Sequence, residues 1–110
     1  TLALSHGTWQ GIEVGGYEIH HGVCRSLEDA EAFLDGIHVG PVWGTMWHGA
    51  FEHDEFRRTW LADAARHAGS SWRPHSDELG YQARREAMIE ALADALEAHV
   101  DVDRILHLVR

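Results

Sequence analysis

The chain has 110 residues, of which 45% are hydrophobic and 25% are charged, and its net charge is -9. This composition is typical of one folded domain or a part of one, and it argues against a disordered chain. The negative charge argues against a nucleic-acid partner, because phosphate contacts need clustered Lys and Arg and this chain has nine arginines and no lysine.

The first residues of the chain predict short strands. Residues 2–5 predict a strand that ends at a turn at Gly7, and residues 12–20 alternate apolar and polar side chains. The adjacent glycines Gly15 and Gly16 interrupt this second run. We therefore expect two strand pieces joined by a bulge or a bend.

Residues 23–37 allow two interpretations. Ser26 as an N-cap, acidic residues in the next turn and Gly36 as a stop favour a short helix. Residues Ala32–Leu34 could instead form a short strand. The sequence leaves this choice open.

The apolar run VWGTMWHG, residues 42–49, follows Pro41 and has the length of an interior strand. A helix is expected next, capped by Asp54 and ended by Gly69. The apolar stripe of this helix consists of Phe56, Trp60, Leu61, Ala64 and Ala68. His48 therefore lies between a strand and a helix, where α/β proteins place residues that reach a ligand.

Two further helices are predicted after a polar linker at residues 69–75. The first runs from about Ser76 to His99, and the second from Asp103 to Val109. Their expected buried residues are Tyr81, Met88, Leu92, Ala95 and Leu96 in the first, and Ile105, Leu106 and Val109 in the second. Strands followed by helices indicate α+β in a complete domain, whereas the apolar strands favour a part of a larger α/β sheet.

Ten histidines suggest a metal site, but their spacing does not favour one. His20 and His21 are adjacent on a predicted strand, so their side chains point to opposite faces. No HxxxH, HExxH or CxxC pattern occurs. We expect no metal bound by this chain.

A cytoplasmic protein without a membrane partner is expected. No stretch is apolar for long enough to cross a bilayer, and the first residues lack the basic start and the cleavage site of a signal peptide. The single cysteine, Cys24, leaves no internal disulfide and suits a reducing compartment. It also lacks the strand-to-helix elbow that exposes a nucleophile.

Two strings hold the candidate functional residues: GYEIHHG at residues 16–22 and GTMWHG at residues 44–49. His48 could act as a general base, because histidine exchanges protons near neutral pH, or it could simply hydrogen-bond a neighbouring carbonyl. Glu18 and His20 share one face of a strand, where they could form a charge pair or a wall of a substrate pocket.

Together with the tail ALADALEAHVDVDRIL, the strings GYEIHHG and WGTMWHGAFEHDEFRRTWL resemble the C-terminal end of the cobyric acid synthase family. These are glutamine-dependent amidating enzymes of cobalamin (vitamin B12) biosynthesis. The resemblance implies an α/β fold, the C-terminal portion of a flavodoxin-like glutamine amidotransferase domain, with a few strands followed by two to three helices. Residues 1–69 would form the C-terminal half of that domain and residues 70–110 its helical tail.

In that family a cysteine attacks the side-chain amide of glutamine, and the resemblance implies that His48 is its base. The ammonia would pass to a synthetase domain, where ATP and Mg²⁺ activate side-chain carboxylates of a corrinoid, an adenosylated cobyrinic acid diamide. Other amidotransferases orient this histidine with a glutamate two residues later, whereas Gly49 and Ala50 follow here, and Glu18 is one candidate for that role.

The cysteine and the ATP site are expected upstream of this chain, so the chain alone should be inactive and bind no cofactor. A second hypothesis is a non-catalytic interaction module that retains the amidotransferase fold. Such a module would bind a partner, or a second copy of itself, through an exposed sheet surface.

Overall fold

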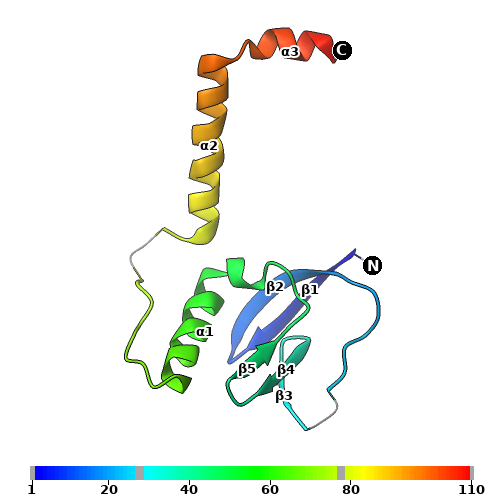
Figure 1. The fold of residues 1–110 in the computed structure, drawn as a ribbon, viewed down its shortest axis with the longest axis vertical. Helices are drawn as coiled ribbons and strands as arrows, with labels where there is room; N and C mark the ends of the chain where they lie inside the picture. The colour runs from blue at the N-terminus through cyan, green and yellow to red at the C-terminus, as the bar shows by residue number, and fades with distance from the viewer. Residues whose placement is uncertain (1, 27–28, 77–78, 110) are drawn as a thin grey trace. The chain divides into compact units, whose positions relative to one another are not determined.

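The computed structural model describes residues 2–26, 29–76 and 79–109. The chain divides into two compact units, Thr1–Asp77 and Glu78–Arg110. The described part of the first unit holds the strands and helix α1, and that of the second holds helices α2 and α3 (Figure 1). The fold is thus mixed α/β, with a few strands followed by three α-helices, as predicted.

Strands β1 (Leu2–Trp9) and β2 (Ile12–Ile19) form an antiparallel hairpin. Its turn is made by Gln10 and Gly11, which both have positive φ, at 51° and 81°. This is the backbone that a two-residue hairpin turn requires. The prediction that the first strand ends at Gly7 is therefore wrong, because the chain turns only after Trp9.

The predicted bulge in the second strand is also wrong. Strand β2 runs without interruption through Gly15 and Gly16, which pair in regular register with His6 and Ser5 of β1. The glycines allow close approach instead of a bend. A Cβ atom on Gly16 would lie only 2.8 Å from the carbonyl oxygen of His48.

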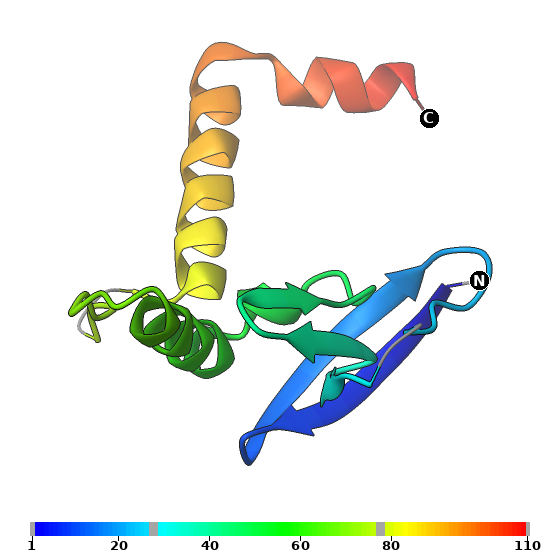
Figure 2. The same cartoon turned by 60° about the horizontal axis from the view of Figure 1, so that its bottom comes forward.

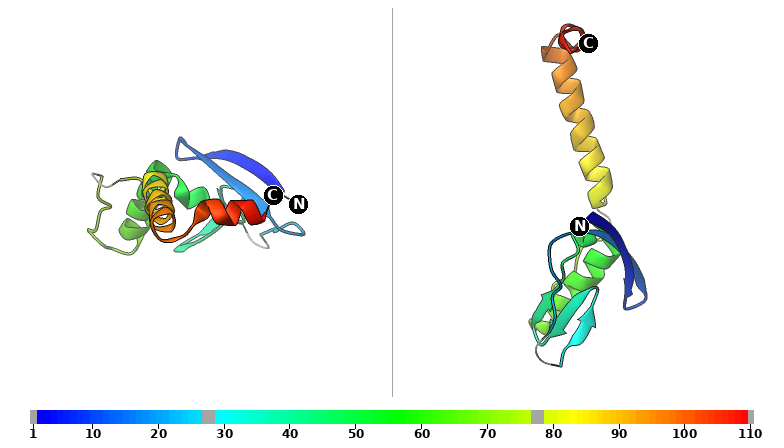
Figure 3. Two further views of the ribbon diagram at one scale, coloured as in Figure 1. Left: turned by 90° about the horizontal axis from the view of Figure 1, so that it is seen from above. Right: turned by 90° about the vertical axis from the view of Figure 1, so that its right-hand side faces the viewer.

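A second antiparallel sheet has the strand order β3 (Glu31–Phe33), β4 (Gly36–Val39) and β5 (Val42–Gly44). Figures 2 and 3 show it as a sheet separate from the longer hairpin. Over its described residues the region 23–37 therefore contains a strand, which confirms the second interpretation and makes the helix wrong. The interior strand predicted over residues 42–49 is wrong as well, because β5 is short and lies at an edge of its sheet.

Helix α1 (Asp54–His67) follows a 3-10 turn, η1 (Ala50–Glu52). The residue before the helix is His53, so Asp54 lies in the first turn, where it pairs with Arg57, rather than at the cap. The predicted stop at Gly69 is confirmed. Gly69 has φ 68°, and its amide donates to the Arg66 carbonyl at 3.0 Å. The amide of the next residue, Ser70, donates to the Ala65 carbonyl at 2.8 Å. These two bonds make a Schellman ending.

The core of the first unit joins both sheets to α1. Its fully buried residues are Val14, Phe33, Ala50 and Phe56, and its partly buried ones are Trp9, Ile12, Leu34, Trp43, Trp47 and Trp60. The ring of Trp9 meets Phe33 and Phe56 edge-on, with centroids 5.9 and 5.6 Å apart. The predicted stripe of α1 is confirmed in part: Phe56 is buried and Trp60, Leu61 and Ala64 are partly buried, but Ala68 is exposed. The prediction also omitted Asp63, which is buried and pairs with Arg66.

The second unit consists of α2 (Tyr81–His99) and α3 (Val102–Leu108). Helix α2 begins later than Ser76 but ends at His99 as predicted. Helix α3 is capped by the Asp101 carboxylate, which accepts from the Arg104 amide at 3.0 Å. No described helix is long and apolar enough to cross a membrane.

The buried faces predicted for these two helices are wrong. Every side chain of the two predicted faces is exposed, including Met88 at 57%, Leu92 at 59% and Leu96 at 58%. Helical periodicity predicts where apolar side chains gather on a helix, but a second surface must cover them before they are buried. The described residues of this unit supply no such surface.

Candidate functional site

The two histidine-containing strings lie side by side. Tyr17 of β2 forms an antiparallel bridge with His48, which follows the end of β5. The Tyr17 amide donates to the His48 carbonyl at 3.0 Å, and the His48 amide donates to the Tyr17 carbonyl at 2.8 Å. The sequence presented the strings as separate strand ends, whereas the structure joins them into one site.

The side chains of this bridge stack on each other. The rings of Tyr17 and His48 have centroids 5.3 Å apart and planes inclined by 15°. Directly paired residues point to the same side of a sheet, so both rings lie on the face of the hairpin that also carries Leu2, Leu4 and Ile19. All five side chains are exposed. The imidazole of His48 is therefore accessible from outside the unit.

Glycines stand where the bridge leaves no space for a side chain. Gly49 has φ 76°, and a Cβ atom there would lie 3.3 Å from Cε1 of Tyr17. A Cβ atom on Gly16 would likewise lie 2.8 Å from the His48 carbonyl oxygen. The His-Gly pair at residues 48–49 and the Gly-Tyr pair at residues 16–17 thus fit each other closely.

Glu18 and His20 lie on the opposite face of β2 from Tyr17. The carboxylate of Glu18 accepts from Ser5 Oγ at 2.5 Å and lies 2.9 Å from Nε2 of His20, the contact that the charge-pair alternative requires when the imidazole is protonated. The Ser5 hydroxyl, and after it His20, lowers the pKa of Glu18 below its ordinary value of 4.5. The hydrogen bonds of Glu18 are thus directed away from His48. Whether Glu18 and His20 contact substrate stays a prediction.

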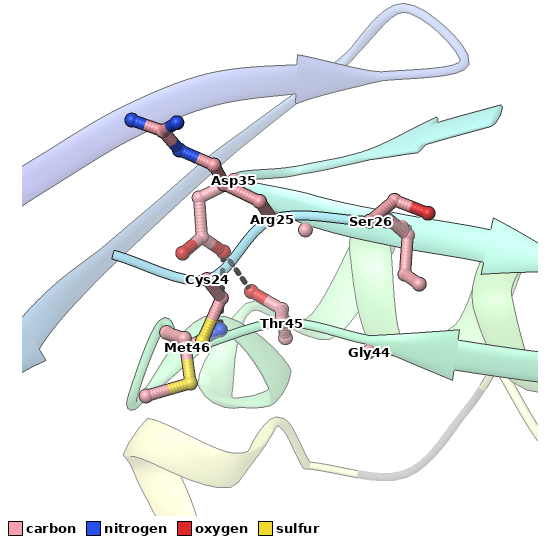
Figure 4. A pocket seen from close by; sticks show the side chains of 9 residues that line it. Cys24, Arg25, Ser26, Asp35, Gly44, Thr45 and Met46 are labelled. Carbon is pink, nitrogen blue, oxygen red and sulfur yellow. Dashed lines mark hydrogen bonds between the residues drawn. The ribbon is translucent and has the colours of Figure 1, made fainter. Parts of the chain in front are cut away.

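A pocket of about 240 Å³ lies elsewhere in the first unit, between the segment 24–26, the β3–β4 turn and the end of β5 (Figure 4). In it the Asp35 carboxylate accepts from Thr45 Oγ1 at 2.5 Å and from the Met46 amide at 3.1 Å. Cys24 lines this pocket on an irregular segment. Sequence reasoning missed this pocket, because its walls come from segments that no local pattern links.

The described residues contain no group of three or more His, Cys, Asp and Glu side chains that could hold a metal ion. Several histidines pack against aromatic rings instead. His38 stacks on Trp43 with centroids 4.4 Å apart, and its Nε2 lies 2.7 Å from the Gly40 carbonyl. His67 meets Trp43 edge-on at 5.2 Å.

Curated proteins named cobyric acid synthase match the chain over all or nearly all of its length. The one from Cutibacterium acnes is 97% identical over 110 residues. Those from Mycolicibacterium gilvum and Streptomyces coelicolor are 42% and 43% identical over 109 residues. The chain spans 23% of the length of the first and 21% of each of the others.

No family model and no solved structure matches the chain. The identity of 97% nevertheless extends over every residue of the chain, and relatives from two other genera support it at more than 40%. The chain therefore belongs, as a segment, to the cobyric acid synthase family.

Proposed function

We propose that this segment is the C-terminal part of a flavodoxin-like glutamine amidotransferase domain, and that His48 is the base of its Cys-His pair. The observation that carries this proposal is the Tyr17–His48 bridge, which fixes the backbone of His48 while leaving its imidazole exposed. A general base must be held in place and must be reachable by its partner, and His48 meets both requirements.

In the proposed reaction, the cysteine comes from the rest of the cytoplasmic enzyme and approaches the exposed face of the hairpin. His48 takes the thiol proton, and the thiolate attacks the side-chain carbonyl of glutamine. The imidazolium then gives its proton to the departing ammonia. Water, activated by the same imidazole, hydrolyses the glutamyl thioester and restores the thiol.

The ammonia would serve the ATP-dependent amidation of side-chain carboxylates of cobyrinic acid a,c-diamide, a step of cobalamin biosynthesis. The residues of this chain do not fit ATP and Mg²⁺. Its sequence holds no glycine-rich phosphate loop, and its described residues hold no cluster of metal ligands. We therefore assign both to another domain of the enzyme and expect the isolated chain to release no ammonia from glutamine.

We also propose that Glu18 and His20 contact substrate. The Glu18 carboxylate is ionised at neutral pH, as any glutamate with a pKa at or below 4.5 is, and a carboxylate suits a cationic group of a ligand. Because these side chains face away from His48, the contact would involve a part of the substrate remote from the reacting amide. Replacing Glu18 by Gln in the full-length enzyme should then raise the KM for the substrate that Glu18 contacts and leave kcat unchanged.

The experiment that tests the base uses a full-length cobyric acid synthase in which these 110 residues replace the matching segment. His48→Ala should lower glutamine hydrolysis by about 10²- to 10⁴-fold, the usual contribution of a general base. Amidation supplied directly with ammonia should continue, because it bypasses the Cys-His pair. His21→Ala, an exposed histidine of the neighbouring string, is the matched control.

Unchanged glutamine hydrolysis in His48→Ala would remove the base role and favour the interaction module.

One observation supports that second candidate: the hairpin presents exposed Leu2, Leu4 and Ile19 on the face of His48. A two-stranded ribbon with such a face gains stability from a covering partner or a second copy. Light scattering of the purified chain should then show a dimer, whereas a stable monomer would contradict self-association.

A further inference from the structure

Tyr17 is the residue most closely engaged with His48, yet no step of the proposed reaction uses it. We propose that Tyr17 is a positioning residue that holds the imidazole of His48 in the plane required for proton transfer. This inference rests on the proposed function, since it assigns a second residue to the same site.

The backbone contacts of Tyr17 fix where His48 stands. Two hydrogen bonds, of 3.0 and 2.8 Å, tie the amide and the carbonyl of His48 to the same residue of β2. On the far side, Ala50 is buried in the core and anchors the chain after Gly49. The main chain of His48 is therefore held from both directions, and the remaining freedom is rotation of the side chain.

The ring of Tyr17 restricts that rotation. It stacks on the imidazole with centroids 5.3 Å apart and an inclination of 15°. In the part of the chain that the structure describes, no side chain is hydrogen-bonded to the imidazole, and Glu18 is engaged with Ser5 and His20 on the other face. The aromatic ring thus orients the imidazole by stacking, which is one of the tasks that a carboxylate performs by hydrogen bonding in a catalytic triad.

The surrounding glycines keep the two rings in contact. A Cβ atom on Gly49 would lie 3.3 Å from Tyr17 Cε1, and one on Gly16 would lie 2.8 Å from the His48 carbonyl oxygen. Larger residues at either position would separate the rings or displace the bridge. Because the contact is made by the ring rather than the hydroxyl group, phenylalanine should replace tyrosine and an aliphatic residue should not.

The test uses the same full-length enzyme with Tyr17→Leu, Tyr17→Phe and His48→Ala. Misplacing a catalytic group by about 1 Å costs up to about 100-fold, so Tyr17→Leu should lower kcat for glutamine hydrolysis by about 10- to 100-fold, with KM for glutamine unchanged. Tyr17→Phe should retain the parent kcat, and ammonia-dependent amidation should be the same in all variants. Leu4→Ala, which changes the cross-strand neighbour of Tyr17, is the control for the hairpin face.

The outcomes separate this inference from the proposed function. Parent kcat in Tyr17→Leu together with loss of hydrolysis in His48→Ala would overturn the positioning role and leave the base role standing. Parent activity in both variants would overturn the two together. A Tyr17→Leu variant that loses glutamine- and ammonia-dependent activity equally, with a lower Tm, would show a merely structural role and also overturn the inference.

Discussion

Replacement of Gly16 by alanine tests the bridge between the two histidine strings directly. The new Cβ atom would lie 2.8 Å from the carbonyl oxygen of His48 and 3.2 Å from Cβ of Trp47. The first of these is a backbone atom and cannot rotate away. Strand β2 and the segment around His48 must therefore move apart, which breaks the two hydrogen bonds between Tyr17 and His48.

The magnitude follows from those two hydrogen bonds. Each contributes about 1 kcal/mol to stability, so their loss costs about 2 kcal/mol. Alanine recovers about 0.4–1 kcal/mol by restricting the unfolded chain. The free energy of unfolding should thus fall by about 1–2 kcal/mol when these effects are combined. Gly44→Ala is the matched control, because a Cβ atom on this strand glycine meets nothing within 4 Å.

The assay is urea unfolding of the chain followed by tryptophan fluorescence, together with glutamine hydrolysis by the full-length enzyme. Gly16→Ala should lower both the urea midpoint and the rate of hydrolysis, and Gly44→Ala should lower neither. If both variants unfold at the same urea concentration and hydrolyse glutamine equally, the close approach at Gly16 does not hold the site together and the reasoning is refuted.

Three further variants test other parts of the first unit in the same urea assay. Phe56→Ala removes a fully buried ring and should lower the free energy of unfolding by about 3–5 kcal/mol. Phe51→Ala removes a ring that is 38% exposed and should lower it clearly less. Equal losses of stability would contradict the assigned core. Ionised Glu18 has a lowered pKa, so its stabilisation is present above pH 4.5 and is lost as the pH falls through the lowered value. Ser5→Ala removes the main cause and should make this acid-side loss shallower, and an unaltered pH profile would speak against the Ser5 bond. Gly69→Ala forces alanine into a left-handed conformation and should cost about 1–2 kcal/mol; no change would mean that the helix end adjusts freely.

Helix α1 shows which part of the fold the sequence could predict. Its acidic first turn, its apolar stripe and Gly69 at its end are all local signals, and each acts within a few residues. The structure reproduces the helix from Asp54 to His67 with the predicted stop. Local chemistry is sufficient here because the hydrogen bonds of a helix are themselves local.

The region 23–37 shows where local chemistry is insufficient. Ser26 as an N-cap and the acidic residues after it favour a helix, but Phe33 is buried in the core against Trp9 and Phe56. Extended pairing of β3 with β4 places Phe33 there, so tertiary packing overrides local propensity. The exposed faces of α2 and α3 show the reverse case, in which a local pattern predicts burial and the described unit offers nothing to pack against.

The candidate site divides in the same way. The period of two residues along a strand predicts that Glu18 and His20 share a face, and the structure places His20 Nε2 2.9 Å from the Glu18 carboxylate. Nothing in either string alone predicted that Tyr17 and His48 would pair. Their contact depends on where the segment that contains His48 meets β2. That register is set by packing between parts of the chain that are far apart in the sequence.

Trp47 offers the physical reason for this register. A Cβ atom on Gly7 would lie 3.0 Å from its indole ring, and one on Gly16 would lie 3.2 Å from its Cβ atom. The indole therefore lies over glycines of both strands of the hairpin, on the core side. Since successive residues of an extended chain point to opposite faces, seating Trp47 on the core side turns His48 to the exposed side, beside Tyr17. Gly16, one of the two glycines that suggested a break in the strand, thus helps to direct the proposed base outward.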